Sequence, residues 1–326
     1  MTILAAMLAV YASGFDADDP LNALEVGERP EPQVPEGWVA VRVKAASLNH
    51  HDLWSLRGVG LSQSALPMIL GCDAAGVDAD GREVIVHSVI GSASAGGGDE
   101  SLDPARSLLS EKHQGTFAQW VVVPRQNLLP KPAALSFEQA ACLPTAWLTA
   151  YRMLFTRGHL QPGETVLVQG AGGGVASAAI MLARHAGARV WATTRDKGDF
   201  ALEMGAHAVF DSGQRLPHRV DLVIETVGAV TWSHSIRSLR PGGRVVVSGA
   251  TTGGQPPADL AHVYFRQLSI IGSTMGTAAE LQRLIDMCEA TELRPPIDAE
   301  YPLADARDAF ARLNAGDVRG KLVLTV

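Results

Sequence analysis

The chain has 326 residues, of which 47% are apolar and 19% charged, so it can bury two domain cores and lacks the composition of a disordered protein. Its formal charge of -7 and its pI near 5.8 argue against a broad surface for nucleic acid or for an anionic membrane, and leave room only for a small phosphate site. Cys72, Cys142 and Cys288 are too widely spaced for a metal cluster or a disulfide framework, which favours a reducing cytoplasm.

The first third of the chain is a series of short apolar runs separated by turn residues. The N-terminal run is shorter than the roughly 18 apolar residues of a membrane span, so it predicts a buried first strand instead. Together these runs predict a compact, mostly β domain, with strands in residues 6–13, 38–47, 82–88 and 116–124.

From about residue 131 the pattern changes to continuous apolar runs that alternate with helical stretches. Continuous runs indicate strands covered on both faces, as in a parallel sheet between helices. The tail holds only a short helix, around residues 305–313, and a closing strand, so we expect it to pack on the first third. The predicted fold is α/β, with a mostly β domain (residues 1–130 and 290–326) and a doubly wound, six-stranded parallel sheet (residues 131–289).

The strongest local motif is TVLVQGAGGGVASAA, which reads as strand, glycine-rich turn and helix. Gly170 and Gly173 would allow a tight turn that brings backbone N–H groups near a pyrophosphate, while the small Ala176 lets the helix lie close on the sheet. The positive end of the helix dipole also favours the anion. The expected cofactor contacts of this motif are Gly170, Gly172, Gly173, Gly174 and Val175.

The end of the second strand of this motif indicates which dinucleotide binds. An NAD site usually has an acidic residue there, whereas this chain has Thr194, Arg195 and Lys197. Arg195 could form charge-assisted hydrogen bonds of about 1.5–3 kcal/mol with a 2′-phosphate, and Thr194 could add a hydroxyl donor. We therefore expect NADP(H); the alternative is a solvated basic loop.

The motifs SLNHHDLWSLRG, LPMILGCDAAG, GTFAQWVVVP, LPTAWLTAYRML, QGAGGGVASAA, FRQLSIIGSTM and RGKLVLTV extend over nearly the whole chain. Together they resemble the medium-chain dehydrogenase/reductase superfamily, within it the zinc-free, quinone-oxidoreductase-like branch. The resemblance implies a GroES-like catalytic domain and a Rossmann-type nucleotide domain. It also implies cofactor contacts at the carboxyl ends of the later strands, from Thr226, Gly249, Ala250, Ser273 and Thr274.

The resemblance also bears on metal binding. Zinc alcohol dehydrogenases of this superfamily take their catalytic ligands from the positions of Asn49, Cys72 and Thr145, of which only the cysteine binds zinc well. Residues 91–114, where relatives carry four cysteines around a structural zinc, contain none. We expect no metal, and in place of the structural site a mobile loop; whether it closes over a ligand is left open.

The expected chemistry follows from the missing metal. Zinc stabilises the alkoxide that forms when a simple carbonyl is reduced, whereas a quinone or enone spreads the charge over an enolate that hydrogen-bond donors can stabilise. We expect NADPH-dependent hydride transfer to such a conjugated carbonyl, with Asn49 and Thr145 near the oxygen. The proton would come from His51, from His50 or from solvent.

Two other functions fit the sequence, namely a metal-independent alcohol or aldehyde reductase and a non-enzymatic NADP(H)-binding sensor.

For some residues near the motifs, a structural role is the expected one. Asp52 is expected to accept hydrogen bonds behind the site, Trp54 to pack, and Cys142 to be an inert buried thiol. Lys321 could reach a phosphate or form a surface salt bridge.

Association with a second copy is expected from LSIIGS, the sixth strand of the predicted sheet. An exposed apolar sheet edge is rarely left uncovered, so pairing edge to edge would give a homodimer with a continuous sheet. The other expected partner is a small-molecule substrate, with neither nucleic acid nor membrane involved.

Overall fold

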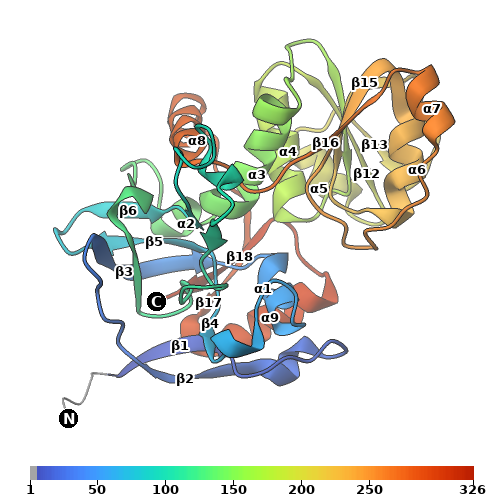
Figure 1. Ribbon diagram of the computed structural model, residues 1–326. Coiled ribbons are helices and arrows are strands. Elements are labelled where there is room, and N and C mark those ends of the chain that lie inside the picture. Colours follow the sequence, from blue (N-terminus) through green and yellow to red (C-terminus); the bar gives the residue numbers. More distant parts are fainter. Residues whose placement is uncertain (1–5) are drawn as a thin grey trace. The chain divides into compact units, whose positions relative to one another are not determined.

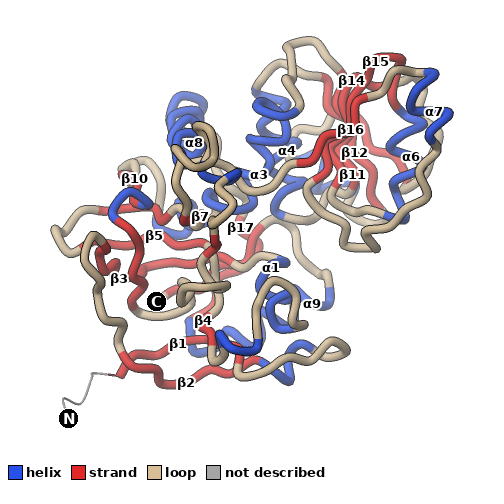
Figure 2. Tube along the Cα trace, in the orientation of Figure 1, coloured by secondary structure: helices blue, strands red, loops and turns tan. Residues whose placement is uncertain are grey.

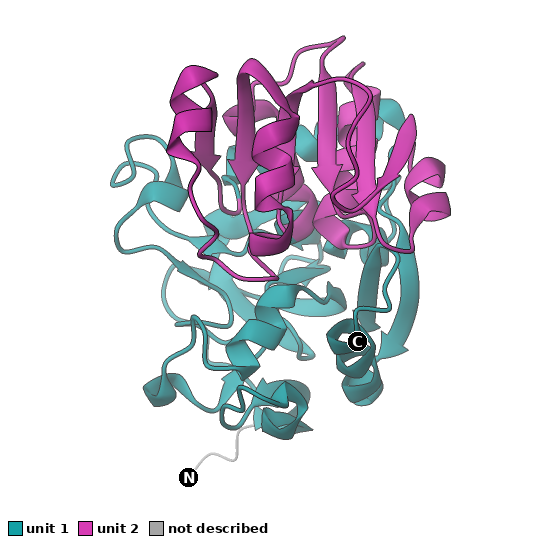
Figure 3. Cartoon of the chain, turned by 90° about the vertical axis from the view of Figure 1, so that its right-hand side faces the viewer, with its two compact units in different colours: residues 1–145, 276–326 teal, residues 146–275 magenta. Residues whose placement is uncertain are grey.

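A computed structural model describes residues 6–326, so the first five residues of the N-terminal apolar run lie outside the described part. The chain forms two compact units (Figure 3): residues up to Thr145 together with Gly276–Val326 make unit 1, and Ala146–Met275 make unit 2. None of the helices in residues 6–326 combines the length and the apolar character that a membrane span requires.

Unit 2 contains the parallel sheet that the sequence predicts. In the described residues its six strands are all parallel and lie in the order β13-β12-β11-β14-β15-β16. This is the order of a doubly wound nucleotide-binding sheet, so the predicted Rossmann-type fold is confirmed. The strands are β11 (Thr165–Gln169), β12 (Arg189–Thr194), β13 (Ala208–Asp211), β14 (Val220–Glu225), β15 (Leu239–Val247) and β16 (Ser269–Gly272).

Helices cover both faces of this sheet, with α4 on one face and α6 and α7 on the other (Figure 1). All five residues of β11 are buried, which explains the continuous apolar run in the sequence. On α4, the spacing of Ala176, Ala179 and Ala183 puts small buried residues on one side. The helices of unit 2 are α3 (Leu148–Tyr151), α4 (Gly174–His185), α5 (Gly198–Glu203), α6 (Ala229–Ser238) and α7 (Leu260–Phe265).

Unit 1 is rich in strands (Figure 2) and has the GroES-like architecture expected from the resemblance. Its main sheet has the order β10-β6-β5-β3-β18-β17, with β9 also paired to β3. The strands of the whole unit, including its two smaller sheets, are β1 (Ala6–Ala12), β2 (Leu24–Pro30), β3 (Trp38–Ser47), β4 (Met68–Ile69), β5 (Asp73–Asp78), β6 (Glu83–Val86), β7 (Val89–Ile90), β8 (Ser107–Leu108), β9 (Trp120–Pro124), β10 (Leu128–Pro130), β17 (Ile297–Pro302) and β18 (Lys321–Thr325). The helices are α1 (His50–Leu56), α2 (Phe137–Ala141), α8 (Ala278–Thr291) and α9 (Ala306–Ala315).

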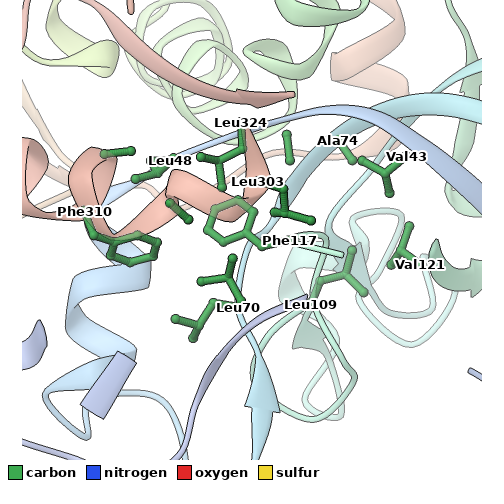
Figure 4. Close-up of a cluster of buried hydrophobic side chains, with 14 of the residues drawn as sticks. Val43, Leu48, Leu70, Ala74, Leu109, Phe117, Val121, Leu303, Phe310 and Leu324 are labelled. Carbon is green, nitrogen blue, oxygen red and sulfur yellow. The ribbon is translucent and has the colours of Figure 1, made fainter. Parts of the chain in front are cut away.

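The C-terminal tail completes unit 1. Strand β18 pairs antiparallel with β3, joining Val323 to Ser47, which confirms that the tail packs on the first third. In the core, Phe310 of α9 meets Phe117 edge to face with ring centroids 6.0 Å apart (Figure 4). Each of these fully buried rings contributes about 1.5–3 kcal/mol of burial free energy, so the tail stabilises the unit.

The unit boundaries differ from the expected ones, which were 130/131 and 289/290. The chain divides instead after Thr145 and after Met275, so α2 and α8 belong to the strand-rich unit. Helix α2 packs on β3 and β5, and the first residue of α8, Ala278, donates its N–H to Glu100 at 2.6 Å. A helical pattern in the sequence does not reveal on which sheet the helix packs, which explains the difference.

Residues 91–114, for which a mobile loop was expected, form several hydrogen bonds within unit 1. Strands β7 and β8 pair across the base of this segment. The Asp103 carboxylate accepts the N–H groups of Ser92 and Ala105, both at 2.8 Å. Glu100 ties the segment to α8 of the same unit by accepting the Ala278 N–H.

Candidate functional site

The glycine turn of unit 2 connects β11 to α4 over residues 170–173. Gly170 has a φ of 81°, a left-handed conformation that favours glycine, and Gly173 caps α4 with open space around its α-carbon. A methyl group on Gly172 would collide with the side chain of Lys197, so the missing Cβ lets that side chain lie across the turn. The turn thus combines a helix N-terminus, a bare backbone and a cationic side chain, which suits a pyrophosphate. Gly174 and Val175 open the helix behind it.

The end of β12 presents a hydroxyl group and basic side chains. Thr194 is the last residue of β12, and its Oγ1 accepts the N–H of Lys197 at 3.0 Å. Its own hydroxyl proton is then available to a ligand. Arg195 is exposed directly after the strand. The strand end therefore offers a hydroxyl group and a cationic side chain to a ligand.

The remaining expected cofactor residues follow the later strands of the same sheet. Thr226 follows β14, and Gly249 lies against it, because a Cβ on Gly249 would be 3.4 Å from the Thr226 α-carbon. Ala250 comes next in the chain. Ser273 and Thr274 follow β16, and the Ser273 N–H bonds to the carbonyl of Val247 at 2.9 Å. All cofactor residues expected from the sequence are therefore in unit 2, at or after the carboxyl ends of its strands.

A buried hydrogen-bond chain, which the sequence reading missed, connects three of these strand ends. Gln169 accepts the hydroxyl of Thr193 at 2.6 Å and donates to Ser235 Oγ at 2.9 Å. Ser235 in turn donates to Glu225 Oε2 at 2.5 Å. Gln169, Thr193 and Glu225 directly precede Gly170, Thr194 and Thr226, so the chain fixes the positions of three expected cofactor contacts. The signal in the sequence was a polar residue at each apolar strand's end.

In unit 1, Asn49 begins helix α1, and both amide hydrogens of its side chain are engaged. They donate to Asp73 Oδ2 at 2.8 Å and to the Ser47 carbonyl at 3.3 Å. Its Oδ1 accepts from Lys321 Nζ at 2.7 Å. In this arrangement the Asn49 amide links Asp73 and Lys321 in one hydrogen-bond network. It has no hydrogen left for a substrate oxygen.

Lys321 has a role that the sequence did not predict. Its side chain is only 2% exposed, and Nζ donates to the Leu48 carbonyl at 2.6 Å and lies 3.6 Å from Asp73 Oδ2. Both sequence-based interpretations, a phosphate contact and a surface salt bridge, are wrong, because the ammonium is buried and engaged inside unit 1. It neutralises one of the two buried carboxylates near α1.

The second buried carboxylate, Asp52, accepts the Asn49 N–H at 2.8 Å, in line with the expected structural role. Burial raises its pKa to about 7, with the charge of Asp73 adding to the effect. The Lys321 ammonium therefore balances the Asp73 carboxylate, whereas the Asp52 carboxyl takes up a proton near neutral pH. Cys72 is affected in the same way, because burial and Asp52 raise the pKa of its thiol.

The positions that hold zinc in related enzymes do not form a metal site here. Within residues 6–326 no group of three or more histidine, cysteine, aspartate or glutamate residues could hold a metal ion. The Cys72 thiol donates to the Leu109 carbonyl at 3.3 Å and is not favoured as a thiolate. The ammonium of Lys321 already supplies a positive charge beside Asp73. These donors do not fit a catalytic zinc ion.

The other expected catalytic residues, His51 and Thr145, each have an unsatisfied polar atom. His51 Nε2 and Thr145 Oγ1 are buried and have no hydrogen-bond partner in the described chain. His51 is on α1, whereas Thr145 is the last residue of unit 1 and lies in the π-helical segment Leu143–Trp147. Neighbouring His50 is exposed. Glu111 Oε1 lies 3.9 Å from His51 Nε2, a proximity that the sequence did not indicate.

Comparisons with known proteins agree with both units. A family of alcohol dehydrogenase GroES-like domains matches residues 35–133, and a family named zinc-binding dehydrogenase matches residues 174–290. A crystal structure of an NAD-dependent alcohol dehydrogenase is 35% identical with a TM-score of 0.89, covering 98% of this chain and 100% of that one. The quinone oxidoreductase of Pongo abelii is 29% identical, over 87% of this chain and 88% of its own length.

A further structural relative was solved with ligands. It is a 2-octenoyl-CoA carboxylase reductase in complex with NADP and 2-octenoyl-CoA, at 27% identity and a TM-score of 0.92. The match covers 98% of this chain and 87% of the chain of that relative. The similarity extends over both units of the present chain.

Proposed function

The chain belongs to the medium-chain dehydrogenase/reductase superfamily and is an oxidoreductase of that type, and on this basis we propose that it transfers hydride from NADPH to a conjugated carbonyl without a metal ion. The substrate class is a quinone or an enone. The proposal assigns the chain to the zinc-free, quinone-oxidoreductase-like branch of the superfamily.

The observation that carries the proposal is the network of Asn49, Asp73 and Lys321. In the proposal this network would take the place of a ligand set, so that no Lewis acid would stabilise an alkoxide. Hydride added to the far carbon of a conjugated carbonyl leaves a delocalised enolate, for which neutral donors suffice. The names of relatives, quinone oxidoreductase and 2-octenoyl-CoA carboxylase reductase, support the same substrate class.

NADPH, when bound, would supply the hydride. On the side of the chain, the glycine turn would hold the pyrophosphate through backbone N–H groups and the Lys197 side chain that lies across it, and Arg195 would hold the 2′-phosphate. Thr226, Gly249, Ala250, Ser273 and Thr274 would frame the nicotinamide. The relative that was solved with NADP supports the choice of the phosphorylated cofactor.

In the proposed mechanism, Thr145 and His51 act on the substrate oxygen. The unpartnered hydroxyl of Thr145 would donate a hydrogen bond to the oxygen as negative charge develops there. His51 would deliver the proton. Asn49 would act as a positioning residue, because its amide is fully engaged at the start of α1.

We also propose a homodimer formed through β16. This strand is the last in the sheet order, and Ile270 on it is 48% exposed. The neighbouring helix α7 exposes Phe265 at 78%. Edge pairing of two copies would cover this apolar surface.

The three cysteines are free thiols, in keeping with a proposed cytoplasmic location.

The test is NADPH consumption with benzoquinone, cyclohexenone, cyclohexanone and no acceptor. The last two carbonyls form a matched pair, since cyclohexanone differs only in lacking the conjugated double bond. We expect turnover of benzoquinone and cyclohexenone and almost none of cyclohexanone. Preferential turnover of the saturated ketone would favour an alcohol or ketone reductase, the alternative that the similarity to an alcohol dehydrogenase supports. Binding of NADPH without any turnover would indicate a sensor.

A further inference from the structure

The turn formed by residues 108–113 carries an acidic side chain toward helix α1. Ser110 has a φ of 65°, and its N–H bonds to the His113 carbonyl at 2.9 Å, which makes the turn tight. The Cys72 thiol donates to the Leu109 carbonyl at 3.3 Å and fixes the turn from the other side. Glu111 is at the tip, so its position is set by the turn rather than by a flexible loop.

Three segments of unit 1 converge at Glu111. Its Oε1 is 3.9 Å from His51 Nε2, and the two side chains are 25% and 20% exposed. A Cβ built on Gly60 would lie 3.4 Å from Glu111 Oε1 and 3.9 Å from His51 Cε1, so this glycine borders both groups. The buried Nε2 has no hydrogen-bond partner among residues 6–326. A small side-chain rotation would bring the carboxyl group into hydrogen-bond range of it.

From this juxtaposition we infer that Glu111 and His51 act as one acid pair, in which Glu111 returns to His51 the proton that His51 gives to the substrate. The inference rests on the proposed function and adds a positioning residue to it. The segment that bears Glu111 lies where related enzymes carry their structural zinc.

The proton transfers balance as follows. Once hydride has been added to the conjugated carbon, the enolate oxygen takes a proton from His51, so an N–H bond breaks and an O–H bond forms. Because Nε2 faces Glu111, Nδ1 is the atom that donates to the substrate. The Glu111 carboxyl gives its proton to Nε2 as the Nδ1 proton leaves, so no imidazolate forms and His51 is left as the Nε2–H tautomer. Return of the Nε2 proton to Glu111, together with uptake of one proton from water at Nδ1, restores the pair. The sum is one hydride and one proton added to the substrate.

The surroundings favour sharing of one proton between the two groups. Burial lowers the pKa of His51, while Asp73 acts in the opposite direction. Burial raises the pKa of Glu111, against the Leu108 N–H and the charges of Arg106 and Lys112. Burial thus disfavours the charged form of each group.

The variant that tests this inference is Glu111→Gln, which keeps the size of the side chain and removes its ionisable proton. Glu289→Gln is the matched control, because it makes the same replacement at an exposed position of α8 in the same unit. For Glu111→Gln we expect kcat with cyclohexenone to fall by about 10-fold or more, with an increased solvent isotope effect on kcat. The Kd for NADPH and the unfolding midpoint should stay unchanged.

Two further variants exclude a merely structural effect. Glu111→Asp keeps the acid one methylene shorter and should recover part of the lost kcat. The double variant His51→Gln, Glu111→Gln should be no slower than His51→Gln alone, because residues that act as a unit are not additive. Wild-type kcat in Glu111→Gln, or a double variant that shows the product of both losses, would overturn the inference. Failure of the wild type to turn over cyclohexenone or benzoquinone would instead overturn the proposed function.

Discussion

Replacement of Asp52 by asparagine is expected to stabilise the protein at alkaline pH. Asp52 is fully buried, and its Oδ2 accepts the Asn49 N–H at 2.8 Å, an acceptor role that an asparagine oxygen can also fill. Burial raises the pKa of the Asp52 carboxyl in the folded protein to about 7, from an ordinary value of 3.8. A carboxyl with a raised pKa contributes stability below the unfolded value and loses it as the pH rises through the folded value.

The magnitude follows from the difference between these two pKa values. Just over three pH units at 1.36 kcal/mol each correspond to about 4 kcal/mol of unfolding free energy. Asparagine does not ionise, so Asp52→Asn avoids this penalty. Its advantage over the wild type should be less than about 1 kcal/mol at about pH 4 and should approach about 4 kcal/mol at about pH 8.

The assay is denaturant unfolding of both proteins at a series of pH values, followed by tryptophan fluorescence. Asp18→Asn is the control, because Asp18 is exposed. We expect the advantage of Asp52→Asn to grow with pH and that of Asp18→Asn to stay near zero. If Asp52→Asn were equally or more destabilised at alkaline pH, the carboxylate would be stabilised by its surroundings and the buried charge balance described above would be wrong.

Three further predictions concern the cofactor site and the association state. Arg195→Ala should lower kcat/KM for NADPH by about 10-fold or more and leave that for NADH nearly unchanged, because one charge-assisted phosphate contact is lost; an unchanged ratio of the two would contradict NADPH preference. Gln169→Leu should weaken NADPH binding and cost about 2 kcal/mol of unfolding free energy, measured by fluorescence titration and denaturation, since it leaves Thr193 and Ser235 without a shared partner; wild-type affinity would show that the chain of bonds does not fix the cofactor contacts. Ile270→Glu should convert the proposed dimer to a monomer in sedimentation at micromolar concentration, and a monomeric wild type would refute the edge pairing.

The parts of the fold that local patterns determine could be predicted from the sequence. The apolar runs of β11 and β12 and the glycines between β11 and α4 specify strand, turn and helix within thirty residues, and the structure has these elements where they were expected. The parallel sheet follows from the same continuous runs. The C-terminal tail was also expected to pack on the strand-rich unit, because its one helix and closing strand are too small to form a core alone, and β18 does pair with β3.

The interior of the candidate site could not be predicted, because it depends on contacts between distant parts of the chain. Lys321 is 272 positions from Asn49 and reaches it only through the pairing of β18 with β3. Glu111 comes near His51 through a tight turn whose shape depends on Ser110 and Cys72. A lysine or glutamate in the sequence is more often exposed, so neither residue stood out.

The most direct test of the central claim is a comparison of turnover and metal content in the same preparation. NADPH oxidation with cyclohexenone would be measured before and after exhaustive treatment with a chelator, alongside elemental analysis for zinc. We expect an unchanged kcat and far less than one zinc ion per chain. About one tightly bound zinc ion per chain, with turnover lost when it is removed and regained when it is restored, would contradict metal-free hydride transfer.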